Sequence, residues 1–331
     1  MKALYLASPD LLNSALTPTL QEKLNKIVEV NYDEAQSITK LPANEINDKL
    51  NEYEVLIGGW GAVQLPADYQ PREGQLYCSL TGTFGQKVDY EHAKRGLRLA
   101  NWGDSISHTI AESALMMILS SLRLVVPYYE SIQLKNEWRL KNLESRSLFD
   151  RKVGLLGFGL IAKKLIPLLA PFNVEVTTYD PYASDETLAE FNIKRSNSIE
   201  ELFSTSDIIS NHAAKTEQTN NIVNAKILSC LPDDGIFVNT ARGNVLVEDD
   251  LAKEHKNGRL FSALDVFQQE PLPAESLLRN EPRCLLFPHQ SGPTRDQYNK
   301  MAERAIENIR RFKEGEPLIM EVSAEQLKIM T

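Results

Sequence analysis

Cysteine is scarce in this sequence, which has Cys78, Cys230 and Cys284 among 331 residues. An odd number at wide spacing supplies neither the disulfide framework of a small secreted domain nor a Cys-x-x-Cys metal site. Each thiol is therefore expected to be a small buried side chain in a reducing compartment. The sequence predicts no metal site.

Long apolar runs are absent as well. The richest stretch, residues 114–126 (ALMMILSSLRLVV), is interrupted by Ser120, Ser121 and Arg123. It is shorter than the roughly 20 apolar residues that a membrane helix needs. The first residues, MKALYLASPDLL, predict a β-strand. They lack the long apolar segment of a signal peptide. A cytoplasmic protein with no membrane partner is predicted.

Positive charge is in deficit, since 36 Lys and Arg face 45 Asp and Glu, for a formal net charge of −9. A general nucleic-acid binder needs a basic face, so no nucleic-acid partner is predicted. Sixteen Gly and sixteen Pro are too few for a collagenous or low-complexity chain. The remaining composition is globular, and the length suggests roughly two domains.

Short apolar runs alternate with helix-like segments along the chain, which predicts an α/β protein with parallel sheets. One series of strand-like runs covers residues 2–7, 27–31, 54–59, 76–82 and 97–101, and a second covers residues 152–157, 174–180, 207–212, 235–240, 261–266 and 284–288. A long apolar helix begins near Ser105, between the two series. A final helix from about Thr294 to Lys313 is closed by Gly315. A domain boundary is expected near residue 102.

The clearest local pattern is the Gly-x-Gly-x-x-Ala of residues 157–162, between a strand-like run and a helical pattern. In such a loop Gly157 permits the tight turn, and Gly159 lets the backbone approach a pyrophosphate. The helix that opens at Leu160 and Ile161 offers free N–H groups and a positive dipole end to the phosphates. The pattern predicts dinucleotide binding, with an ordinary strand–helix turn as the alternative.

An acidic residue ends the next predicted strand, in Tyr179-Asp180-Pro181. Asp180 at this place would accept hydrogen bonds from the adenosine ribose and repel a 2′-phosphate, which favours NAD over NADP. The alternative is that Asp180 merely begins an Asp-Pro turn.

Ionisable residues stand at or just after the predicted strand ends: Arg242, Asp265, Glu270, His289 and His212. In an open parallel sheet, ligands bind beyond the carboxyl ends of the strands. An imidazole exchanges a proton with an alcohol near neutral pH, a neighbouring carboxylate fixes its tautomer, and a guanidinium clamps a carboxylate. This set suits hydride transfer on a hydroxy acid. On these grounds alone, both histidines are possible acid–base residues.

Residues 105 to 315 resemble the D-isomer-specific 2-hydroxyacid dehydrogenase family. The resemblance rests on the glycine loop, on residues 239–243 (NTARG) and 263–267 (ALDVF), and on Glu270-Pro271 and Pro288-His289. It implies a doubly wound parallel Rossmann sheet in residues 103–290. This NAD-binding domain would be inserted into a flavodoxin-like α/β substrate domain of residues 1–102 and 291–331. The implied enzyme exchanges a hydride between NAD and C2 of a small D-2-hydroxy acid or 2-oxo acid, as a homodimer that the apolar helix helps to build.

The resemblance also implies a role for each matching residue. Arg242 would bind the substrate carboxylate and keto oxygen, His289 would be the acid–base, and Glu270 would pair with it, which decides against His212. Asp265 would contact the nicotinamide carboxamide. The cofactor-binding set would be Gly157, Gly159, Leu160, Ile161, Asp180, His212, Thr216, Thr240 and Asp265. Glu270 separates the chain from the family's formate dehydrogenases, which carry Gln there.

Two departures from the family pattern leave the substrate open. Ala214 stands where the family often has proline. The usual Gly-Val-Gly-Val-Asp loop of the substrate domain reads GTFGQ in residues 82–86. The substrate-loop candidates are Trp60, Gly82, Thr83 and Phe84; Trp60 and Trp138 could line the pocket or belong to the core.

A binding protein remains an alternative to an enzyme, because the family includes NAD-sensing corepressors that keep the catalytic residues. The acidic balance and the absence of long disordered tails favour an enzyme. Only residues 316–331 follow Gly315, so the regulatory domain of the long phosphoglycerate dehydrogenases is not expected.

Overall fold

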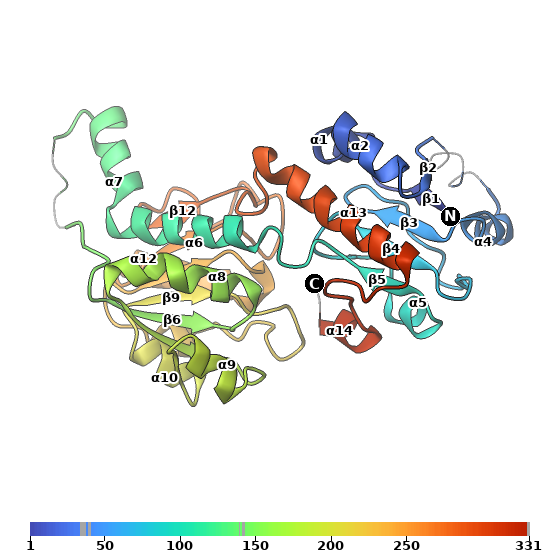
Figure 1. Ribbon diagram of the computed structural model, residues 1–331. Helices are drawn as coiled ribbons and strands as arrows, with labels where there is room; N and C mark the ends of the chain where they lie inside the picture. The colour runs from blue at the N-terminus through green and yellow to red at the C-terminus, as the bar shows by residue number, and fades with distance from the viewer. Residues whose placement is uncertain (34–37, 39–40, 139, 141–142, 330–331) are drawn as a thin grey trace. The chain divides into compact units, whose positions relative to one another are not determined.

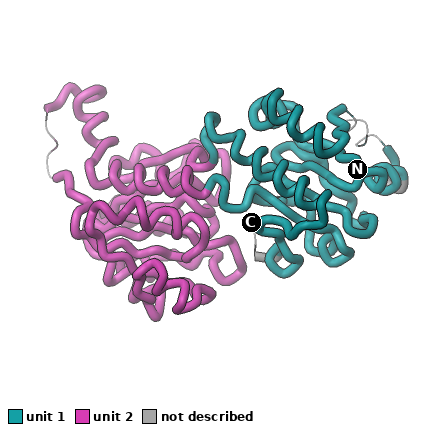
Figure 2. Tube along the Cα trace, in the orientation of Figure 1, with its two compact units in different colours: residues 1–106, 293–331 teal, residues 107–292 magenta. Residues whose placement is uncertain are grey.

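The computed structural model describes residues 1–33, 38, 41–138, 140 and 143–329 (Figure 1). Contacts within the chain divide it into two compact units (Figure 2). Unit 1 consists of residues 1–106 and 293–331, and unit 2 consists of residues 107–292. Unit 2 is therefore an insertion in the sequence of unit 1.

Unit 1 is built on a five-stranded parallel sheet of order β2-β1-β3-β4-β5. The strands are β1 Lys2–Tyr5, β2 Glu29–Asn31, β3 Val55–Gly58, β4 Leu76–Ser79 and β5 Arg98–Ala100. The helices are α1 Pro9–Ala15, α2 Pro18–Asn25, α4 Ala43–Leu50, α5 Tyr90–Lys94, α13 Tyr298–Glu314 and α14 Ala324–Ile329. α13 packs on α1, α2 and β4 although it lies far away in sequence (Figure 1). It ends, as predicted, at Gly315, whose φ of +70° is a left-handed cap.

Unit 2 is built on a seven-stranded parallel sheet of order β12-β11-β10-β9-β6-β7-β8. The strands are β6 Lys152–Leu156, β7 Glu175–Tyr179, β8 Lys194–Arg195, β9 Ile208–Asn211, β10 Ile236–Asn239, β11 Phe261–Leu264 and β12 Cys284–Leu286. The helices are α6 Ser107–Leu122, α7 Val125–Tyr129, α8 Leu160–Leu169, α9 Asp185–Glu190, α10 Ile199–Ser204, α11 Ala225–Leu228 and α12 Glu248–Lys256, and a π-helical turn follows α7 at Glu130–Leu134. The strand order reverses between β6 and β9, which is the switch point where such sheets bind ligands.

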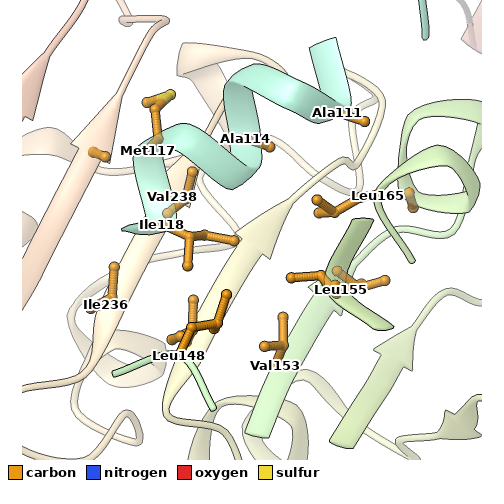
Figure 3. Close-up of a cluster of buried hydrophobic side chains, with 14 of the residues drawn as sticks. Ala111, Ala114, Met117, Ile118, Leu148, Val153, Leu155, Leu165, Ile236 and Val238 are labelled. Atoms are coloured by element: carbon orange, nitrogen blue, oxygen red, sulfur yellow. The ribbon is translucent and has the colours of Figure 1, made fainter. Parts of the chain in front are cut away.

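The core of unit 2 covers both faces of its sheet, because successive strand residues point to opposite sides. Leu155 lies in one buried cluster and Leu156 in the other. Val238 lies in the same cluster as Leu155, and Phe237 lies in the same cluster as Leu156. Figure 3 shows α6 laying Ala111, Ala114, Met117 and Ile118 over one of these faces. The apolar side of α6 is therefore used inside unit 2.

The predicted α/β class and the parallel Rossmann-like sheet are confirmed, and each predicted strand contains an observed one. Sequence patterning missed β8, a strand of two exposed charged residues. Cys78 and Cys284 are buried free thiols as expected, but Cys230 is partly exposed.

Among the described residues, no single helix is long and apolar enough to cross a membrane. α6 and the segment Val125–Leu134 reach that length and composition only together, across a bend of 57°.

Candidate active site

The glycine loop joins β6 to α8 at the switch point of unit 2. Gly157 has a φ of +91°, and a Cβ there would lie 2.8 Å from the backbone nitrogen of Ala213, so the fold itself requires glycine. Gly159 is different, because a Cβ there would meet no protein atom within 4 Å. Ala162 is fully buried. No side chain caps the first N–H groups of α8, which leaves them free for an anion.

Asp180 follows β7 and already holds three backbone N–H groups. Its Oδ2 accepts from Phe158, in the glycine loop, at 2.6 Å, and its Oδ1 accepts from Tyr182 at 2.7 Å and Ala183 at 3.2 Å. A carboxylate offers about four acceptor positions, so capacity remains for a ribose hydroxyl. Both interpretations of Asp180 are therefore compatible: it forms the Asp-Pro turn, and it lies beside the loop that would receive the cofactor.

The guanidinium of Arg195, which the sequence pattern did not indicate, reaches the loop that follows β7. Arg195 of β8 donates to the carbonyl oxygens of Asp180 at 2.9 Å and Ala183 at 2.6 Å, and it pairs with the carboxylate of Asp185 at 2.7 Å. The missed strand β8 is what carries it there.

His212, at the end of β9, is held in a way that does not suit proton transfer. Its Nε2 lies 2.9 Å from Ser210 Oγ, and its Nδ1 is buried with no protein partner in the described structure. Burial lowers the pKa of His212 to about 4, so the imidazole is neutral at physiological pH. Farther along the same loop, the Thr216 N–H donates to Thr219 Oγ1 at 2.8 Å.

Two buried asparagines link the ends of β9 and β10. Asn211 Nδ2 donates to Asn239 Oδ1 at 3.0 Å, and both residues are fully buried. Asn211 Oδ1 accepts the Ala213 N–H at 3.1 Å, while Asn239 accepts the Ala241 N–H at 3.1 Å and donates to the Arg242 carbonyl at 3.0 Å. Sequence reasoning quoted Asn239 only as part of a motif and did not single out Asn211.

The loop after β10 carries Thr240 and Arg242. Thr240 Oγ1 is buried without a protein partner among the described residues. Burial lowers the pKa of the Arg242 guanidinium below its usual value, and the Glu270 carboxylate opposes that shift. A Cβ on Gly243 would lie 1.9 Å from the carbonyl carbon of Phe267. Glycine therefore lets the arginine loop pack directly on the loop that carries Glu270.

His289 and Glu270 form a close pair although they come from different loops. His289 Nδ1 lies 2.7 Å from Glu270 Oε2, and Glu270 Oε1 accepts the Phe267 N–H at 3.0 Å. The His289 side chain remains 53% exposed, so the rest of its ring is open to a ligand. A pocket of about 550 Å³, walled largely by apolar residues such as Leu272 and Phe287, opens beside the pair.

Asp265 is buried beneath the His289 loop. Its two carboxylate oxygens accept the N–H groups of Gln290 at 2.7 Å and Ser291 at 2.9 Å, and its carbonyl accepts the His289 N–H at 2.9 Å. Burial raises the pKa of Asp265, and these N–H groups counteract that rise. Its visible task is to hold the loop of His289, a residue with a φ of +55°; the nicotinamide contact stays a prediction.

The substrate-loop candidates lie in unit 1 and differ in exposure. Trp60 is 42% exposed and packs edge-on against Tyr298, with ring centroids 5.7 Å apart. Phe84 is buried against Tyr77, so its bulk goes into the core of unit 1 and only its backbone could meet a ligand. Gly82 leaves no room for a side chain, because a Cβ would lie 2.3 Å from the Trp102 ring.

The same loop fixes Thr83 through its backbone, since the Thr83 carbonyl accepts from Thr81 Oγ1 at 3.2 Å.

In unit 2, Trp138 is 79% exposed and therefore does not belong to a core within the described chain.

The family model for the NAD-binding domain of D-isomer specific 2-hydroxyacid dehydrogenases matches residues 115–291. A D-3-phosphoglycerate dehydrogenase of Methanocaldococcus jannaschii is 26% identical over 303 residues, which cover 91% of this chain and 57% of that protein. A glyoxylate reductase of Korarchaeum cryptofilum is 29% identical over 230 residues, which cover 68% of this chain and 69% of that protein.

A solved structure extends the likeness to the whole fold. The apo D-mandelate dehydrogenase of Rhodotorula graminis superposes with a TM-score of 0.81 at 20% identity, over 97% of each chain. The present chain spans little more than half the length of the Methanocaldococcus protein.

Proposed function

Because the chain belongs to the D-isomer specific 2-hydroxyacid dehydrogenase family, we propose that it is an NAD(H)-dependent oxidoreductase. It exchanges a hydride between the nicotinamide and C2 of a small D-2-hydroxy acid or 2-oxo acid. The observation that carries this proposal is the His289–Glu270 pair at 2.7 Å, in the same unit as the half-buried guanidinium of Arg242 and the glycine loop.

The three side chains divide the chemistry among them. Arg242 binds the carboxylate of the 2-oxo acid, which a planar guanidinium does in bidentate fashion. His289 donates a proton from Nε2 to the keto oxygen in reduction, and takes it back in oxidation. Glu270 accepts from Nδ1, which fixes the ring orientation and stabilises the imidazolium. Because Arg242 is partly withdrawn from water, its attraction for the substrate carboxylate is strengthened.

The glycine loop and the ends of the neighbouring strands fit NAD. The open side of Gly159, the uncapped N–H groups of Leu160 and Ile161, and the unpartnered Thr240 Oγ1 are groups that a dinucleotide would satisfy. When bound, the nicotinamide supplies or accepts the hydride. Asp180, Asp265 and the backbone of the loop that carries His212 and Thr216 are proposed to complete the site. Unit 2 would then be the NAD-binding domain and unit 1 the substrate domain.

We further propose that the protein is a cytoplasmic homodimer. Three free thiols suit a reducing compartment. Exposed apolar side chains gather on the segment that follows α6, namely Val125, Tyr129, Ile132, Leu134 and Trp138. Monomers rarely leave such a patch uncovered. No nucleic-acid or membrane partner is proposed.

The direct test is a panel of 2-oxo acids assayed with NADH by absorbance, beginning with glyoxylate, hydroxypyruvate and phenylpyruvate. Saturable turnover is expected for at least one acid. His289→Ala is expected to lower kcat by about 10²-fold or more, the usual scale for a general acid–base, while His108→Gln on the surface of α6 keeps it.

Tight NADH binding without turnover of any acid would instead favour a corepressor-like sensor. No relative reported above supports that alternative. Near-normal kcat in His289→Ala would remove His289 from the mechanism and leave the family assignment intact.

A further inference from the structure

The asparagine pair of β9 and β10 occupies an unusual place for two buried polar side chains. Asn211 and Asn239 stand in register as the last residues of adjacent parallel strands. Both are fully buried, and the residues in register with them on the flanking strands β6 and β11, Leu156 and Leu264, are apolar. Leu would fill the same space without needing hydrogen-bond partners, so the amides call for an explanation.

The orientation of each amide is dictated by backbone groups. The Ala213 and Ala241 N–H groups can only meet an amide oxygen, and the Arg242 carbonyl can only meet an amide nitrogen. With these three contacts made, the nitrogen of Asn211 faces the oxygen of Asn239 at 3.0 Å. Neither amide can rotate by 180° without placing like groups opposite each other.

The pair lies between two loops with different proposed tasks. On one side, Asn211 holds Ala213, whose backbone nitrogen would lie 2.8 Å from a Cβ on Gly157 of the glycine loop. On the other side, Asn239 holds both ends of the Ala241–Arg242 turn. The pair therefore joins the backbone of residues 212–214 (the cofactor loop) to the backbone of residues 240–243 (the arginine loop).

We propose that Asn211 and Asn239 are positioning residues for Arg242, with Asn239 fixing the arginine turn and Asn211 fixing both Asn239 and the cofactor loop. The inference rests on the proposed role of Arg242 in binding the substrate carboxylate. A guanidinium clamp depends on its angle to the carboxylate, so a small rotation of the turn weakens binding of the acid. Asn239 acts on acid binding, and Asn211 acts on both ligands.

The sharpest test is Asn239→Asp, which keeps the shape and both acceptor roles and changes only the donor to the Arg242 carbonyl. The ionised carboxylate repels that carbonyl, whereas the protonated acid donates to it. The titratable groups at the adjoining strand ends are His212 just after β9, Asp265 just after β11 and Arg242 on the turn itself. We expect the KM for glyoxylate to rise about tenfold at pH 8, the effect of losing one buried hydrogen bond. At pH 5.5 the ratio of the variant's KM for glyoxylate to that of the wild type should fall back toward one.

A matched control exists in unit 1. Asn308 on α13 is fully buried and bonds both polar groups of Ile319, at 2.7 and 3.3 Å. Asn308→Asp makes the same chemical change away from the site, and it is expected to give no pH-dependent change in KM relative to wild type. If it reproduces the profile of Asn239→Asp, or if Asn239→Asp leaves KM unchanged at pH 8, the positioning role is wrong.

Asn211→Leu tests the role proposed for Asn211. Because it removes the acceptor of Ala213 and the donor to Asn239, we expect weaker NADH binding by fluorescence and a higher KM for glyoxylate together. Hydrogen–deuterium exchange of the unliganded protein should become faster in residues 212–214 and 240–243, a readout that needs no turnover.

The two readouts separate the positioning role from the proposed function. Unchanged exchange would overturn the positioning role even in an active enzyme. Faster exchange with no wild-type turnover of any 2-oxo acid would overturn the proposed function alone.

Discussion

At the scale of single residues, the ionisable groups of the proposed site each have a hydrogen-bonding neighbour that holds them in place. Glu270 accepts a backbone N–H with one oxygen and faces His289 with the other. Asp265 accepts two backbone N–H groups below the same loop. His212, buried with its pKa lowered to about 4, is neutral. His289, which faces the Glu270 carboxylate from an exposed loop, is therefore the histidine that we propose as the acid–base.

Asp180 gives the first prediction, which concerns cofactor choice. Asp180→Asn removes the negative charge and one acceptor while keeping the size of the side chain. We expect kcat/KM for NADPH relative to NADH to rise about tenfold, since a 2′-phosphate no longer meets a carboxylate. Asp185→Asn is the matched control, because Asp185 is a nearby exposed charge that pairs with Arg195. An equal change in both variants would mean that Asp180 has no specific contact with the ribose.

At the scale of elements, α8 and its preceding loop separate the demands of folding from those of binding. Gly157→Ala forces a methyl group against the backbone of residues 212–213 at a φ of +91°, so the variant should lose stability in urea unfolding. Gly159→Ala meets no protein atom and should unfold like wild type. Its NADH Kd should nevertheless rise about tenfold, because the methyl group occupies the approach of the pyrophosphate. Normal NADH affinity in Gly159→Ala would place the phosphates elsewhere.

α12 carries a buried histidine that couples stability to pH. Burial, and then the charge of Arg283, lowers the pKa of His255 to about 4, and neither ring nitrogen has a partner in the described structure. The unfolded state, with a pKa near 6.5, binds more protons between these values, so stability is complete above about pH 6.5 and falls as pH drops toward 4. His255 alone would cost about 2 kcal/mol at pH 5.

His255→Leu removes this proton uptake. Urea unfolding at pH 5 and pH 8 should therefore give a smaller difference in unfolding free energy than wild type, by about 2 kcal/mol. A wild-type difference in the variant would assign the acid sensitivity to other groups, among them His212.

The elements themselves were largely predictable, and their contacts were not. β10 reads as an apolar run because it is buried on both faces, whereas β8 is two exposed charged residues without a pattern. The positions of Arg242, Glu270 and His289 just after strand-like runs were sufficient to indicate them as site residues from the sequence. The bond between Asn211 and Asn239 joins residues 28 positions apart and depends on strand order. No periodicity reveals it. The burial of Phe84 likewise follows from how its loop turns back onto Tyr77.

At the scale of the whole molecule, a net charge of −9 would have to coexist with the anionic cofactor and the anionic substrate of the proposed function. In the proposed site these anions would be held by short-range groups, namely the uncapped N–H groups at α8 and the half-buried guanidinium of Arg242. Such short-range devices are screened less by salt than a charged surface would be.

Assembly gives the last prediction. In Figure 1, α7 leaves the end of α6 and extends away from the sheet of unit 2. Val125, Tyr129 and Leu134 on this segment are 50%, 59% and 68% exposed. If a second copy covers them, Leu134→Glu should turn a dimer into a monomer in sedimentation velocity. Leu277→Glu is the matched control, since Leu277 is 67% exposed elsewhere on unit 2. A wild-type monomer at micromolar concentration would overturn the proposed dimer, and a dimer that survives Leu134→Glu would place its interface outside this segment.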